Sequence, residues 1–256
     1  MQWRATETFR HSDRTMLVHR PPHESASGPQ FVLVHGIGVS ARYYTRLARA
    51  LAPSGGVHVV DLPGFGRAPR PHEPLLIEDH AEVLNAYVRS AGLRHPLLVG
   101  HSMGTQVVVE AALQAPDLHV GVVAIGGVVD PAARTAPLQA LRLAQDVLRE
   151  PPLTNWTVLS GYARTGVRWY LRTLPAMLGY RTEEALPRLT VPLLVVRGAR
   201  DPIATGEWTE QMGRLGPGTR VVEIDGAAHV AMHTHPDQVA RAVLEHVQAV
   251  AGQGSA

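Results

Sequence analysis

Residues 96–104 read Pro-Leu-Leu-Val-Gly-His-Ser-Met-Gly, an apolar run that ends in a G-x-S-x-G motif centred on Ser102. The motif lies between a strand-like stretch and a helical one. A serine in such a turn has a strained backbone, and a Cβ atom at Gly100 or Gly104 would collide with the neighbouring strand or helix. The strain lifts the hydroxyl clear of the sheet, and the free N–H groups of the following helix favour negative charge beside it. We therefore predict that Ser102 is a nucleophile; the alternative is an ordinary helix-capping serine.

Strand-like and helical stretches alternate on both sides of this motif. Short apolar runs predict strands at residues 31–34, 57–60, 96–99, 120–125, 191–196 and 219–224. Helical patterns cover residues 42–51, 77–91, 102–115 and 236–250. Continuous apolar strands are typical of a buried parallel sheet, so the fold class is α/β. Two β-rich stretches at 3–9 and 15–19 predict an antiparallel hairpin at the start of the chain.

The alternation stops between residues 130 and 187. This stretch contains amphipathic helical pieces and no strand-like run, and it carries prolines at positions 131, 137, 151, 152 and 175. We expect a helical cap at 131–187, inserted into a core formed by residues 1–130 and 188–251. Residues 252–256 are expected to be a disordered tail.

Composition excludes several kinds of chemistry. The 256 residues include no cysteine and no lysine, which removes thiolate nucleophiles, disulfides, Schiff-base chemistry and Walker-type phosphate loops. The formal net charge is +2, and arginines alternate with acids, so we expect a solvated surface rather than a nucleic-acid site. We expect no signal peptide and no membrane anchor, with the cytoplasm as the default location. Nothing in the sequence indicates an oligomeric state.

A serine nucleophile needs a base, and in this arrangement the order along the chain is serine, acid, histidine. His229 follows the last predicted strand in a loop of small residues, Asp225-Gly-Ala-Ala-His229. Asp201 follows the strand before it and is the predicted acid, which would orient the imidazole and stabilise its charged form. Asp130 also follows a strand and is the alternative acid; its competing role is to cap a helix that starts at Pro131.

Two further features concern the same site. His229, His233 and His235 could be read as a metal cluster, but the glutamate of a zinc peptidase is missing, so we predict no metal site. A tetrahedral intermediate needs two N–H donors, and the backbone groups of Ile37 and Met103 are the candidates. His35 is expected to brace the loop that contains Ile37.

These residues resemble the α/β-hydrolase superfamily, in its serine-nucleophile branch with a helical cap. The resemblance rests on five ordered sites: His35-Gly36, the stretch 61–66 (Asp-Leu-Pro-Gly-Phe-Gly), the motif at 100–104, the stretch 198–201 (Gly-Ala-Arg-Asp) and His229. It implies a mostly parallel eight-stranded sheet flanked by helices, no cofactor, and an acyl-enzyme on Ser102 that water hydrolyses. Relatives with an aspartate nucleophile, the haloalkane dehalogenases and epoxide hydrolases, are excluded because a serine occupies that position.

The substrate depends on the cap. Five cap residues are predicted to line the substrate pocket: Trp156, Tyr162, Trp169, Tyr170 and Met177. They favour a small to medium hydrophobic or aromatic carboxylic ester as the small-molecule substrate, although they could equally only pack the cap on the core. Arginines at 164, 168 and 172 recur at helical spacing, either as a solvated face or as partners for an anionic group. A perhydrolase, an acyltransferase, a C–C bond hydrolase and a non-catalytic ligand receptor remain alternatives.

Overall fold

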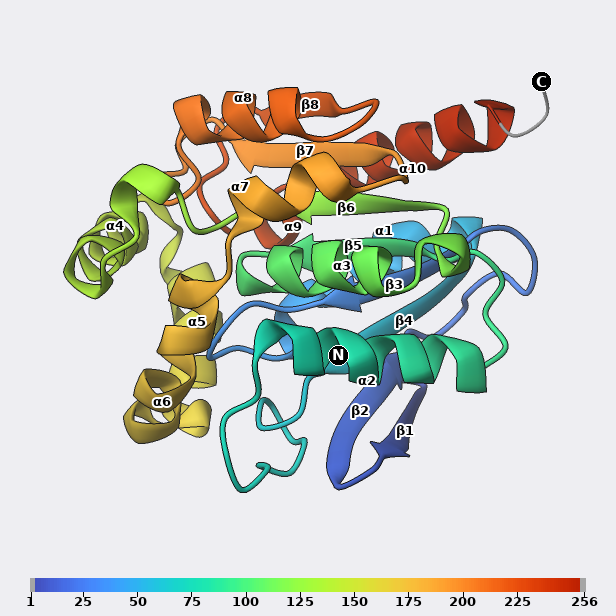
Figure 1. Cartoon of the computed structure of the whole chain (residues 1–256), viewed down its shortest axis with the longest axis horizontal. Helices are drawn as coiled ribbons and strands as arrows, with labels where there is room; N and C mark the ends of the chain where they lie inside the picture. The colour runs from blue at the N-terminus through green and yellow to red at the C-terminus, as the bar shows by residue number, and fades with distance from the viewer. Residues whose placement is uncertain (1–2, 254–256) are drawn as a thin grey trace.

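The computed structural model describes residues 3–253, which fold around an eight-stranded sheet with strand order β1-β2-β4-β3-β5-β6-β7-β8 (Figure 1). The strands are β1 (Ala5–His11), β2 (Arg14–Arg20), β3 (Gln30–Val34), β4 (Gly56–Asp61), β5 (Leu97–His101), β6 (Gly121–Ile125), β7 (Leu193–Gly198) and β8 (Arg220–Ile224). β1 and β2 form the antiparallel hairpin, and β2 is antiparallel to β4. All other neighbours are parallel. The predicted fold class is confirmed.

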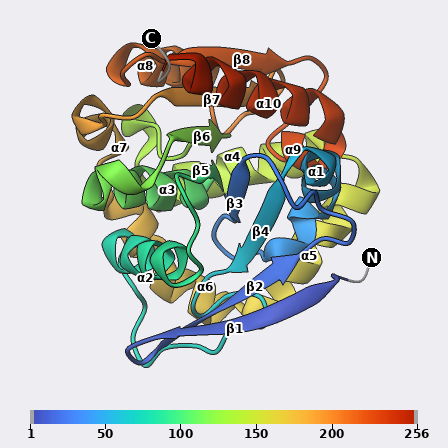
Figure 2. The same cartoon turned by 90° about the vertical axis from the view of Figure 1, so that its right-hand side faces the viewer.

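Helices cover both faces of the sheet, which explains the unbroken apolar strands. Every residue of β4, β5 and β6 is buried, because neither face of these strands meets water. The core helices are α1 (Thr45–Leu51), α2 (Ile77–Ser90), α3 (Met103–Gln114), α8 (Gly206–Leu215), α9 (Ala231–Thr234) and α10 (Pro236–Gln253). One apolar cluster joins the sheet to α2, α3 and α8, and the other joins it to α1, α9 and α10 (Figure 2).

The chain between β6 and β7 is helical and contains no strand. It forms α4 (Ala136–Arg149), α5 (Pro152–Thr165), α6 (Val167–Gly179) and α7 (Thr182–Ala185). Single 3-10 turns lie at Ala41–Tyr44, Ala52–Ser54, Pro116–Leu118, Pro131–Ala133 and Leu186–Arg188. Helices α4, α5 and α6 lie together at the end of the sheet toward which the parallel strands point (Figure 1). At this end of the sheet, the loops that bear Ser102, Asp201 and His229 follow strands β5, β7 and β8.

One boundary differs from the prediction. Helix α10 extends to Gln253, so Gly252 and Gln253 are helical rather than part of a disordered tail. The alanines at 249 and 251 are strong helix formers, and they carry the helix past the point where a glycine suggests a stop. Residues 254–256 lie outside the described residues. Every helix among residues 3–253 is too short or too polar to cross a lipid bilayer.

Candidate active site

Ser102 lies in a sharp turn between β5 and α3, with φ +54° and ψ −125°. The flanking glycines are sterically required. A Cβ atom on Gly100 would lie 2.3 Å from the carbonyl oxygen of Gly104, and one on Gly104 would lie 2.2 Å from that of Val34. Such distances are far shorter than van der Waals contact. They confirm the collision that the sequence analysis expects for a Cβ atom at either glycine. The turn therefore fixes Ser102 at the amino end of α3, where a helix favours negative charge.

His229 and Asp201 form a buried pair beside this turn. His229 Nδ1 lies 2.9 Å from Asp201 Oδ2, and both residues are almost inaccessible to solvent. The other oxygen of Asp201 accepts the N–H groups of Ile203 and Ala204 at 2.8 and 3.0 Å. Because these bonds fix the carboxylate opposite Nδ1, the neutral form of the His229 ring carries its proton on Nδ1 and has its lone pair on Nε2.

The pKa of His229 is raised in this setting. Burial alone would lower the pKa, but the Asp201 carboxylate, followed by the carboxylates of Asp146 and Glu150, raises it to about 9. The negative groups around the ring therefore stabilise its protonated form, the imidazolium.

Other candidates lie elsewhere. Asp130 accepts the N–H of Ala132 at 2.9 Å and pairs with Arg142 at 3.1 Å, so it caps the short turn at Pro131–Ala133. His233 Nδ1 bonds the carbonyl of Tyr43. His235 Nδ1 bonds the hydroxyl of its neighbour Thr234. Among residues 3–253, no three potential metal-binding side chains come together.

A histidine that the sequence analysis passed over links the parts of the site. His101, the residue before Ser102, has its Nε2 2.9 Å from the carbonyl oxygen of His229 and its Nδ1 2.8 Å from the hydroxyl of Tyr43. Tyr43 in turn accepts the N–H of Gly36. The tautomer with a proton on Nε2 satisfies every member of this chain. Burial holds the pKa of His101 well below its usual range, so it remains a neutral brace.

The loop after β3 lies directly against the serine. A Cβ atom on Gly36 would lie 2.9 Å from Ser102 Cβ and 3.3 Å from its Oγ. Ile37, the next residue, is buried at the same place, and Met103 begins α3, where backbone N–H groups lack intrahelical acceptors. His35 accepts the N–H of Leu62 at 3.0 Å and so ties this loop to the end of β4, the bracing role expected for it.

The expected pocket residues divide into three groups. Tyr162 and Tyr170 meet edge to face, with ring centroids 5.5 Å apart, and both contact Gly38 in the loop beside Ser102. Trp169 and Met177 are buried in the core cluster that includes α2 and α3. Trp156 is 68% exposed, which contradicts its predicted place in the pocket.

The error at Trp156 has a geometric reason. Tyr162, six residues later on the same helix, faces inward, and six residues turn the helix by about one and two-thirds turns, so Trp156 points about 120° away from it. The arginine row is not one face either, because the break at Gly166 separates Arg164 on α5 from Arg168 and Arg172 on α6. All three arginines are solvent-exposed, and Arg172 pairs with Glu73.

Two carboxylates also reach the site, although their sequence gave no sign of it: Asp146 in α4 and Glu150, the residue directly after this helix. Asp146 Oδ1 accepts the N–H of His229 at 3.0 Å, and Glu150 Oε1 accepts that of Val230 at 2.8 Å. Both residues are buried, at 4% and 6% exposure, and Glu150 Oε2 has no hydrogen-bond partner among the described residues. Burial raises the pKa of Asp146 and raises that of Glu150 to about 7.

This raised pKa predicts a pH-dependent gain in stability for Glu150→Gln. An acid whose pKa is higher in the folded state stabilises the protein below its unfolded pKa and loses that contribution as the pH rises through the folded value of about 7. Glutamine can accept the same N–H without burying a charge. We expect the free energy of unfolding to rise by about 1–3 kcal/mol at pH 8.5 and to change little at pH 4. Urea unfolding at the two pH values measures this, and an equal change at both would contradict the electrostatic cause.

The comparisons with known proteins agree with this architecture. A family model described as "Alpha/beta hydrolase family" matches residues 31–242. The 2-(acetamidomethylene)succinate hydrolase of Mesorhizobium japonicum is 28% identical, with 88% of this chain and 90% of that protein covered. A pimeloyl-[acyl-carrier protein] methyl ester esterase of Methylococcus capsulatus is 27% identical, covering 87% of this chain and 96% of the relative. A hydrolase structure from Pseudomonas aeruginosa superposes with a TM-score of 0.81 at 20% identity, over 95% of this chain and 98% of that one.

Proposed function

Because the chain belongs to the alpha/beta hydrolase family and is a hydrolase, we propose that it cleaves carboxylic esters through an acyl-enzyme on Ser102. The observation that carries this proposal is the buried pair of His229 and Asp201 beside the strained turn at Ser102. The three side chains come from three loops at one edge of the sheet, in the order that acyl transfer on this fold requires.

The proposed reaction starts with proton transfer. His229 Nε2 takes the proton of Ser102 Oγ as this oxygen attacks the ester carbonyl, and Asp201 stabilises the resulting imidazolium. The described residues show no hydrogen bond between Ser102 and His229, and such contacts commonly tighten only when substrate binds. His229 then donates the proton to the departing alcohol. Water repeats the sequence in the second half of the reaction and releases the acid.

The negative oxygen of each tetrahedral intermediate needs two donors. We assign this role to the backbone N–H groups of Ile37 and Met103, which flank Ser102 from the β3 loop and from the start of α3. Because both donors are backbone groups, this role does not depend on the side chains of Ile37 and Met103. The brace formed by His101 and Tyr43 runs between these loops and keeps the donors and the base in register.

Helices α4–α6 would cover the site as a cap. The paired rings of Tyr162 and Tyr170 against Gly38 support a hydrophobic or aromatic ester of small to medium size, since they present apolar surface beside the nucleophile. The similar protein of Mesorhizobium japonicum is a 2-(acetamidomethylene)succinate hydrolase, and that of Methylococcus capsulatus is a pimeloyl-[acyl-carrier protein] methyl ester esterase, so monoesters of dicarboxylic acids belong in the same test.

The test is a substrate profile. Purified protein is assayed with p-nitrophenyl esters of two to twelve acyl carbons and with phenylacetyl and monomethyl dicarboxylate esters. We expect kcat/KM to peak at short or aromatic acyl groups and to fall for long chains, because the paired rings of Tyr162 and Tyr170 lie against Gly38, in the loop next to Ser102. A parallel reaction with a fluorophosphonate reports the nucleophile without depending on the acyl group.

The outcomes separate the alternatives. Labelling with turnover supports an esterase. Labelling without turnover in water, but with acyl transfer to added peroxide or alcohol, would replace hydrolysis by transfer. If folded protein shows neither labelling nor turnover, the proposal fails and a ligand-binding role on this fold takes its place.

A further inference from the structure

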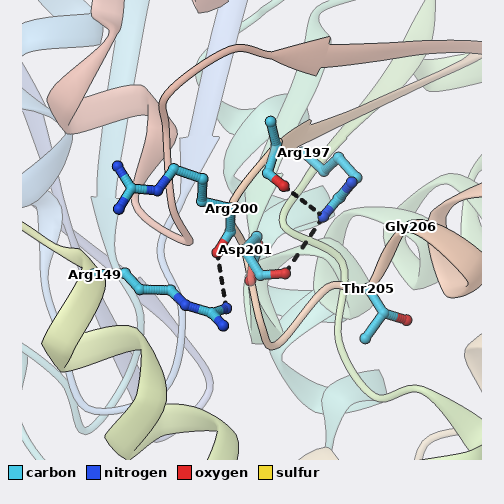
Figure 3. Close-up of a pocket in the computed structure, with 7 residues that line it drawn as sticks. Arg149, Arg197, Arg200, Asp201, Thr205 and Gly206 are labelled. Carbon is cyan, nitrogen blue, oxygen red and sulfur yellow. Dashed lines mark hydrogen bonds between the residues drawn. The ribbon is translucent and has the colours of Figure 1, made fainter.

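Helix α4 contacts the acid loop as well as the histidine loop. Arg149 Nη1 donates to the carbonyl of Arg200 at 3.1 Å, next to Asp201, as Figure 3 shows. Seven residues earlier, about two turns of the helix, Arg142 Nη1 donates to the carbonyl of Ile203 at 3.3 Å. Together with the two carboxylates, these bonds give α4 and the residue directly after it four contacts to the backbone of the loops that carry Asp201 and His229.

The backbone of His229 is therefore held from two sides. Asp146 accepts its N–H, and His101 donates to its C=O. Asp201 fixes the ring through Nδ1. Three atoms of His229 are bonded to three different elements, which determines the direction of Nε2. Of these three hydrogen bonds, the one from Asp146 comes from α4.

The carboxylates also act through their charge. The ionisable groups facing His229 are Asp201 from the β7 loop, Asp146 from α4, Glu150 directly after α4, and the neutral His101 from β5. An amide in place of the carboxylate of Asp146 or Glu150 could accept the same N–H without placing a charge in a buried site. Glu150 gives the stronger evidence for a role of the charge, because its Oε2 is buried without a hydrogen-bond partner among the described residues. A structural bond to Val230 alone does not require that charge.

We propose that Asp146 and Glu150 are positioning residues for His229, which couple helix α4 to the histidine loop and stabilise the imidazolium formed in the reaction. The inference rests on the proposed function of His229 as the base. In this proposal, two carboxylates outside the predicted triad fix the orientation of His229 and raise its basicity. It also gives the C-terminal end of α4 a positioning role for the histidine loop.

The experiment uses paired substitutions that separate the two effects. Asp146→Asn and Glu150→Gln keep an oxygen acceptor and remove the charge, whereas Asp146→Ala and Glu150→Ala remove both. The pKa of the His229 ring is followed by NMR in the full-length protein, with its signal assigned by loss in His229→Gln. Steady-state rates with the best ester are measured from pH 5 to 10.

We expect the amide variants to lower the pKa of His229 by about one pH unit, and to move the rising limb of the pH–rate profile to lower pH by the same amount. The sign follows because a nearby carboxylate favours the protonated ring. The alanine variants are expected to lose about tenfold or more in kcat, with KM little changed, because the base is misdirected rather than the substrate released. The amide variants should retain more of kcat than the alanine variants.

Controls test whether these effects are specific. Gln145→Ala changes an exposed residue of α4, and Glu207→Gln removes an exposed carboxylate of α8; both should leave the profile and the ring pKa unchanged. An unchanged pKa of His229 in all four folded variants, with wild-type kcat, would overturn the inference. The NMR titration needs no substrate. If the variants shift the ring pKa of a protein that has no esterase activity, the electrostatic effect of the two carboxylates on His229 is supported, and only the proposed function is contradicted.

Discussion

Ser102→Ala is expected to lower kcat/KM for p-nitrophenyl esters by about 10⁴-fold or more, and to abolish labelling by a fluorophosphonate. The reason is chemical: alanine leaves no oxygen to attack the carbonyl, while the backbone donors and the base remain. What activity survives would come from water held beside His229 and the N–H groups of Ile37 and Met103.

The same substitution should leave the fold intact. The Ser102 side chain makes no capping bond to α3, and the positive φ at this position is retained by alanine at similar strain. We expect the free energy of unfolding to change by less than about 0.5 kcal/mol. Ser90→Ala, at the exposed end of α2, is the matched control and should retain full turnover. Wild-type rates in a verified Ser102→Ala preparation would show that another residue, or a contaminant, performs the reaction.

The local part of the site could be predicted from the sequence because its constraints are local. At Ser102, steric exclusion of Cβ atoms at Gly100 and Gly104 acts within a few residues, and the flanking strand and helix have clear periodicity. Asp201 and His229 follow predicted strands, and parallel strands end at one edge, so topology alone brings their loops together. The fold class could be predicted from the alternation of strand-like and helical stretches along the chain.

The remaining contacts depend on how α4–α6 dock, which sequence periodicity does not specify. Asp146 lies 83 residues from His229, and in the sequence it is one more polar position on an amphipathic helix. Trp156 was assigned to the pocket by its residue type, but the rotation of α5 turns it outward. His101 lies inside the motif itself, yet its partners Tyr43 and His229 come from distant loops, so only the assembled structure shows its bracing role.

The largest remaining effect is expected at the acid. Asp201→Asn should lower kcat by about 10⁴-fold, the loss that follows when the base is held in the wrong tautomer. Asparagine can still accept the N–H groups of Ile203 and Ala204 through its oxygen. Its NH₂ group would then face His229 Nδ1 as a donor, which forces the ring proton onto Nε2. A ring protonated at Nε2 cannot take the proton of Ser102.

Asp130→Asn is the matched comparison, because Asp130 was the alternative acid in the sequence. In the structure it caps a turn and pairs with Arg142, so its amide variant should retain kcat within about threefold and lose only modest stability. Steady-state assays of both variants, with circular dichroism to confirm folding, decide between the two acids. A severe loss in Asp130→Asn beside a near-normal Asp201→Asn would reassign the acid to the end of β6 and would require the loop after β7 to rearrange. With the opposite result, the buried bond between Asp201 and His229 is the contact on which the base depends.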